Sequence, residues 1–98
     1  MSRSTVLRMI ERIEAIADSV PNAGSIDRLT SLGSQFMGTA MAIKEELERH
    51  GISTRSQQML DLTTSFDTSA GRIVKERWRV QAVMHQTAAY FRGLAERM

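Results

Sequence analysis

The residue types that carry most enzyme chemistry are sparse in this 98-residue chain, and they are not grouped at functional spacings. There is no cysteine, which excludes thiol catalysis, a disulfide framework and a cysteine-based zinc site. The two histidines, His50 and His85, have no companion at the spacing of metal ligands. Glu45, Glu46 and Glu48 form a charged helix end, and no partner carboxylates face them for acid–base catalysis. We therefore expect no catalytic residue and no bound metal.

Two glycines, Gly33 and Gly38, have the spacing of a Walker phosphate-binding loop. That motif also needs a lysine after the second glycine and a β-strand before the first, so that a loop of backbone N–H groups can surround the phosphates. The lysine is missing here and no strand pattern precedes Gly33. We therefore expect neither a cofactor nor a small-molecule substrate, and we predict that the protein is not an enzyme.

Positive charge is concentrated in the last third of the chain. The net charge is only +2, but residues 70–98 hold six basic against two acidic groups, and residues 1–69 hold seven against nine. The basic residues that could contact phosphate or an acidic partner are Arg72, Lys75, Arg77 and Arg79. Strong nucleic-acid binders usually carry a larger net positive charge, so we favour pairing with acidic helices of this chain or of a second chain.

Helical periodicity runs along the whole sequence. Apolar residues at spacings of three and four predict a first helix over about residues 4–19. Pro21 lacks a backbone donor and disfavours helical geometry at Val20, so this helix should end there. Ser25 is a suitable N-cap for a second helix over about residues 25–50. On the far side of that helix, small residues at every fourth position predict close packing of another helix; they are Ser34, Gly38 and Ala42.

A tight reversal is predicted over residues 50–53. Gly51 suits the left-handed position that follows a helix, and Ile52 can make the accompanying apolar contact. Thr54 and Gln57 match a capping box, in which each side chain binds a backbone N–H group of the other residue. The next helix should therefore start at Thr54 and run antiparallel to the second helix.

The last segment covers about residues 54–97 and permits two readings. It is either one helix that bends near Gly71 or two helices broken near 67–71, where poor helix formers gather; we favour the continuous helix. The predicted fold class is all-α, with a single domain over residues 1–98. It consists of an antiparallel helical hairpin with a shorter N-terminal helix, as a three-helix bundle, or a four-helix bundle if the last helix breaks.

The last helix has two apolar faces. One face, with Val80, Met84 and Phe91, can pack on the apolar stripes of the first two helices. The other has no partner in this chain, and it is our predicted partner-binding surface: Val74, Trp78, Ala82, His85 and Ala89. A lone tryptophan is most often a core residue, but flanking arginines are typical of interface hot spots. A continuous rod of about 66 Å would also be too long for the two shorter helices to cover. We therefore predict a homodimer.

The expected function is a non-catalytic protein–protein interaction module, such as a small regulator, an adaptor or a secretion-type chaperone. It would act as a homodimer or on a helical protein partner. The alternative is a small basic nucleic-acid-associated protein that binds the phosphate backbone through its arginine-rich C-terminal helix. The sequence has no signal-peptide pattern and no apolar run long enough for a membrane, so we expect a soluble cytoplasmic protein that does not bind membranes.

Overall fold

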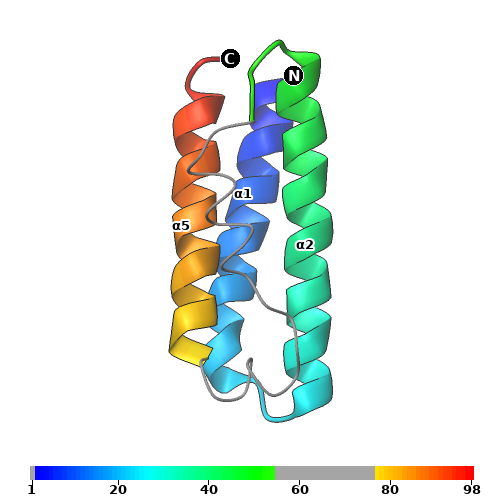
Figure 1. Cartoon of the computed structure of the whole chain (residues 1–98), viewed down its shortest axis with the longest axis vertical. Coiled ribbons are helices and arrows are strands. Elements are labelled where there is room, and N and C mark those ends of the chain that lie inside the picture. The colour runs from blue at the N-terminus through cyan, green and yellow to red at the C-terminus, as the bar shows by residue number, and fades with distance from the viewer. Residues whose placement is uncertain (1, 55–76) are drawn as a thin grey trace.

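The computed structural model describes residues 2–54 and 77–98, and these residues contain helices but no strand (Figure 1). Helix α1 spans Ser2–Ser19 and is followed by a short 3-10 helix, η1, over Val20–Asn22. Helix α2 spans Ile26–Arg49, and helix α5 spans Arg77–Ala95. The predicted all-α class is confirmed. No helix in the described ranges combines the length and the low polarity that crossing a membrane requires.

The connection between α1 and α2 follows the predicted signals. The α-helix ends at Ser19, and Pro21 lies inside the tight turn η1, which the N–H group of Ala23 closes on the carbonyl oxygen of Val20 at 3.3 Å. Ser25 is the N-cap of α2, because its hydroxyl oxygen accepts a hydrogen bond of 3.1 Å from the backbone N–H of Arg28. Two short-range signals, a proline and a capping serine, therefore fix this corner.

The end of α2 also follows its signals. Gly51 has a φ of 75°, and its N–H group donates to the carbonyl of Glu48 at 3.0 Å. The N–H group of Ile52 donates to the carbonyl of Leu47 at 3.0 Å, which completes the Schellman pattern, and the Ile52 side chain is buried. The Thr54 hydroxyl donates to the Glu48 carboxylate at 2.8 Å. Gln57, the other half of the predicted capping box, lies outside the described residues.

The three α-helices are arranged around α1. Figure 1 shows α1 running in the opposite direction to both α2 and α5, while α2 and α5 run in the same direction. Helix α1 packs closely against both neighbours, and α2 and α5 contact each other much less. This arrangement buries one side of α1, with Val6, Ile10, Ile13 and Ala17 fully covered.

Helix α5 runs in the same direction as α2, whereas the preferred prediction of one helix over residues 54–97 required it to run antiparallel; residues 55–76 of that prediction lie outside the described residues. The guanidinium of Arg77 donates to the carbonyl oxygen of Ala23 at 3.0 Å, so α5 begins beside the α1–α2 connection, at the opposite end of α2 from Thr54. The molecule is 38 Å long, far shorter than the expected rod. Folding α5 back onto α1 buries apolar surface on both helices, and a rod would leave that surface in water. The length of the rod is therefore no longer an argument for a dimer. The break predicted near 67–71 lies outside the described residues.

All three α-helices contribute to one apolar core. The predicted stripe of α5 is confirmed where it is described, because Val80, Met84 and Phe91 are buried. Helix α5 also buries residues on both sides of this stripe, so its buried face is wider than the predicted one. The additional buried residues are Val83, Thr87, Ala88, Leu94 and Ala95. The Thr87 hydroxyl donates to the carbonyl of Val83 at 2.8 Å, so the one polar side chain among them is satisfied inside its own helix.

Candidate functional site

The side of α5 that faces away from the core carries the predicted partner-binding residues. Trp78, Ala82, His85 and Ala89 recur at spacings of four, three and four, and Gly93 continues the row. By the helical period, this row lies roughly half a turn from Val80 and Phe91. We call these five residues the outer face of α5. Trp78, His85, Ala89 and Gly93 are exposed and Ala82 is half-buried. Val74, the first predicted member, lies outside the described residues.

Trp78 is the most unusual residue of the outer face. It is 72% exposed, so it is not the core residue that a lone tryptophan most often is. Only two other large apolar side chains in the described ranges are comparably exposed, Ile26 and Met41, and both lie on α2. An indole offers a large, rigid contact area and loses little rotamer freedom when it is buried by a partner. Trp78 is therefore the most exposed large apolar side chain of the described residues.

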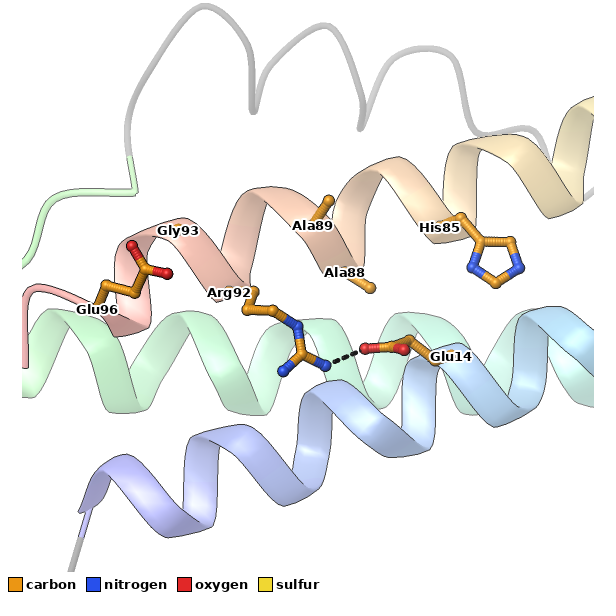
Figure 2. Close-up of a pocket in the computed structure, with 7 residues that line it drawn as sticks. All are labelled: Glu14, His85, Ala88, Ala89, Arg92, Gly93 and Glu96. Atoms are coloured by element: carbon orange, nitrogen blue, oxygen red, sulfur yellow. Dashed lines mark hydrogen bonds and ion pairs between the residues drawn. The ribbon is translucent and has the colours of Figure 1, made fainter.

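Two polar contacts join α5 to α1 along one edge of the outer face. The guanidinium of Arg92 pairs with the carboxylate of Glu14, and Figure 2 shows these side chains pointing toward one another from the two helices. Further along the same edge, Nε2 of His85 lies 3.1 Å from a carboxylate oxygen of Asp18. All four groups are partly open to solvent, so each pair contributes only about 0–1 kcal/mol to stability. Their main effect is to hold the two helices in register.

An open groove lies along the C-terminal half of the outer face. It has a volume of about 360 Å³, and its lining residues, drawn in Figure 2, are Glu14, His85, Ala88, Ala89, Arg92, Gly93 and Glu96. The small residues Ala88, Ala89 and Gly93 form its floor, and the charged residues form its rim. A Cβ atom built on Gly93 would meet nothing within 4 Å, so the groove is open directly above this glycine.

Two polar side chains that line the groove from α5 are paired with carboxylates of α1. Arg92 pairs with Glu14, and His85 pairs with Asp18. In the described part of the chain, no buried side-chain nitrogen or oxygen lacks a hydrogen-bond partner. Small-molecule sites usually combine such convergent polar groups with an enclosed apolar cavity. What this groove offers is an apolar floor between charged edges.

The predicted basic cluster is only partly visible. Arg77 is half-buried and its guanidinium binds the Ala23 carbonyl, so it serves the fold. Arg79 is exposed. Arg72 and Lys75 lie outside the described residues. The described residues therefore supply one exposed arginine from this cluster, and the phosphate-binding alternative remains an untested prediction.

The predicted row of small residues on α2 is also placed. Ser34, Gly38 and Ala42 are all exposed, and a Cβ atom built on Gly38 would meet nothing within 4 Å. Helices α1 and α5 pack on the opposite side of α2, so the row contacts neither of them. Gly33 and Gly38 both lie inside the continuous helix α2, where backbone N–H groups are used by the helix and cannot surround a phosphate.

The remaining chemical candidates cluster at the end of α2. His50 is the C-cap residue, as predicted for a ring near the negative end of a helix, and its Nε2 lies 3.5 Å from Glu46. Arg49 pairs with the same carboxylate at 2.9 Å. Within residues 2–54 and 77–98, no group of three or more histidine, aspartate or glutamate side chains could hold a metal ion.

Sequence reasoning found the outer face but missed the groove. Glu14, Arg92 and Gly93 were not singled out, because the groove exists only when α1 and α5 lie antiparallel. The small residues Ala82, Ala89 and Gly93 lie on one helix face together with polar residues, and this pattern is visible in the sequence. The sequence does not show that α1 packs beside that face. Comparison with protein families, characterised proteins and solved structures finds no significant match to this chain, so its functional interpretation rests on the outer face and the groove.

Proposed function

We propose that this protein is a non-catalytic interaction module that binds a helix of another polypeptide chain on the outer face of α5. The observation that carries the proposal is the exposure of Trp78 at the head of a row with helical spacing in which Ala82, Ala89 and Gly93 are small. Small side chains let a second helix approach to about 8 Å, and a row at spacings of three and four matches the ridges of such a helix. A small regulator, an adaptor and a secretion-type chaperone all fit this description.

The energetic argument rests mainly on Trp78. A tryptophan buries up to about 250 Å² of surface, and roughly 180 Å² of this remains available at 72% exposure. At about 25 cal/mol per Å², covering it would contribute on the order of 4 kcal/mol. Association itself costs at least about 4 kcal/mol, so the indole offsets only the smallest estimate of this cost. The small residues beside it supply the remaining contact area.

The polar groups near the outer face support binding rather than catalysis. A catalytic acid or base needs a free position toward its substrate, whereas Arg92 and His85 are already paired with carboxylates of α1. Such pairs at the rim of an interface contribute little affinity, but they fix the direction in which a partner helix can lie. An amphipathic helix with a small apolar stripe and polar edges would meet both requirements.

The test is site-specific photocrosslinking in the native host. A photoreactive side chain placed at Ala89, on the exposed outer face, should form an adduct with another polypeptide, and the adduct should map to a helical segment of that partner. The same group placed at Thr30, exposed on α2, is the matched control and should form none. In a Trp78→Asp background the adduct should disappear while the circular dichroism spectrum stays unchanged. Equal adducts at both positions, or an Ala89 adduct that survives Trp78→Asp, would refute the proposal.

A further inference from the structure

We infer that the helix that covers the outer face of α5 is α5 of a second copy of this chain, lying antiparallel, with Trp78 of each copy seated over the Gly93 groove of the other. This inference rests on the proposed function and names its partner. Trp78 and Gly93 lie at the two ends of one helix face, 15 residues apart by their numbers, or about 22 Å along the axis. One end of the face therefore has the largest side chain and the other has none.

A two-fold axis turns this asymmetry into self-complementarity. In a two-fold contact, if residue i of one copy meets residue j of its partner, then j also meets i. An axis perpendicular to α5 near residues 85–86 would bring each Trp78 to the other copy's Gly93. The same axis would place Ala82 opposite Ala89. Trp78 of each copy then meets a glycine and the alanines meet each other, so the two α5 helices can approach closely on either side of the two His85 side chains near the axis.

The groove has the right character for an indole. Its floor of Ala88, Ala89 and Gly93 is apolar, and the space above Gly93 is open. Arg92 lies at the rim, held by Glu14 (Figure 2), where its planar guanidinium can lie against the face of an aromatic ring. A tryptophan seated there would gain both apolar contact and a cation–π interaction.

Charge favours the antiparallel direction over the parallel one. Trp78 is flanked in sequence by Arg79 and by Arg77, whose guanidinium binds the Ala23 carbonyl, and the rim of the groove holds two carboxylates, Glu14 and Glu96, against one guanidinium, Arg92. The antiparallel arrangement places the basic end of one helix near the acidic rim of the other, and it does so twice. A parallel pair would place basic end beside basic end and would leave Trp78 facing a second tryptophan instead of a groove.

The absence of cysteine allows a direct test of direction. Two full-length variants, Ala82→Cys and Ala89→Cys, are mixed under mild oxidation and the disulfide-linked products are counted. Antiparallel pairing predicts that the mixed 82–89 disulfide forms at least about ten times faster than either homodisulfide. A parallel pair would instead give 82–82 and 89–89 products and would overturn the inference.

A second measurement tests whether Trp78 of one copy occupies the Gly93 groove of the other. Gly93→Leu fills the groove, and it should raise the dimer dissociation constant by at least about 100-fold in sedimentation equilibrium, as expected for loss of a tryptophan anchor from both halves of the interface. The matched control is Gly38→Leu, also an open helical glycine but on α2, which should leave dimerisation unchanged. Both substitutions replace glycine within a helix, so neither is expected to unfold the chain. Equal dimer dissociation constants for the two variants would contradict binding of Trp78 in the Gly93 groove.

The single tryptophan reports the same event in solution. Its emission should shift to shorter wavelength as the wild-type chain is concentrated through the dimerisation range, and Gly93→Leu should not show this shift. A chain that stays monomeric at all concentrations refutes the inference. If that monomer still forms the Trp78-dependent adduct with a different protein, the proposed function stands without it; if no adduct forms either, both fail.

Discussion

Replacing Trp78 with alanine should destabilise the isolated chain much less than replacing Phe91 with alanine. Phe91 is fully buried between the helices, and Trp78 is 72% exposed. A core Phe→Ala substitution costs about 3–5 kcal/mol, because the lost transfer free energy and the cavity left behind add together. The covered part of Trp78 amounts to roughly 70 Å² of a possible 250 Å². At about 25 cal/mol per Å², its loss costs at most about 2 kcal/mol.

The assay is urea unfolding followed by far-ultraviolet circular dichroism, first at a concentration low enough to keep the chain monomeric. The free energies of unfolding of the two variants should then differ by at least about 1 kcal/mol and by up to about 5 kcal/mol, the difference between the two costs above. At a hundredfold higher concentration the wild-type midpoint should rise through mass action, and the Trp78→Ala midpoint should not.

The refuting result concerns the dilute measurement. If Trp78→Ala costs as much as Phe91→Ala there, with the same dependence on urea, then the indole is a core residue. The outer face of α5 would then have no exposed aromatic anchor, and the proposed binding surface would be refuted. If the dilute values differ as expected but concentration has no effect on the wild type, only self-association is refuted.

Three further experiments test the local structure that supports this surface. In urea unfolding, Gly51→Ala should lower the free energy of unfolding by about 1 kcal/mol, because φ is 75° at this position. Gly38→Ala should raise it by up to about 1 kcal/mol, since Gly38 is helical and has open space around it. Equal effects of the two substitutions would contradict a left-handed backbone at Gly51. Ser25→Ala should cost about 1 kcal/mol by removing the N-cap, and Ser25→Asp should restore it; failure of Asp to restore stability would argue against a capping role. A double-mutant cycle on Arg92 and Glu14 should give a coupling of about 0–1 kcal/mol that shrinks in 1 M salt, and a larger, salt-independent coupling would show a buried pair.

The local parts of the fold could be predicted because their causes are local. Pro21 and Ser25 act on the backbone within a few residues, and so does Gly51, whose φ needs no distant partner. The apolar stripes of α1 and α2 follow from the helical period alone. The exposure of Trp78 could also be predicted, because no other helix in the sequence has an apolar stripe left to cover the face on which Trp78 lies.

The direction of α5 could not be predicted in the same way. The period of a helix says which side is apolar, but it is the same whether the helix runs up or down. The hydrogen bond from Arg77 to Ala23 shows which end of the bundle α5 starts from, and it joins residues 54 positions apart. The groove has the same origin: Glu14 and Arg92 are separated by 78 positions and meet only in the folded chain.

The central place of α1 has a consequence for the order in which the chain folds. Helices α1 and α2 are joined by a short corner and can pair as soon as both exist, whereas the contacts between α1 and α5 close a loop of more than fifty residues. Because closing a long loop costs entropy before its contacts form, α5 should dock last. Until then the α5 side of α1 is open to water, and during synthesis this interval lasts until α5 has emerged. The helix that completes the core is also the helix that carries the outer face. The chain should therefore become competent to bind only when it has finished folding, which protects a half-made copy from premature assembly.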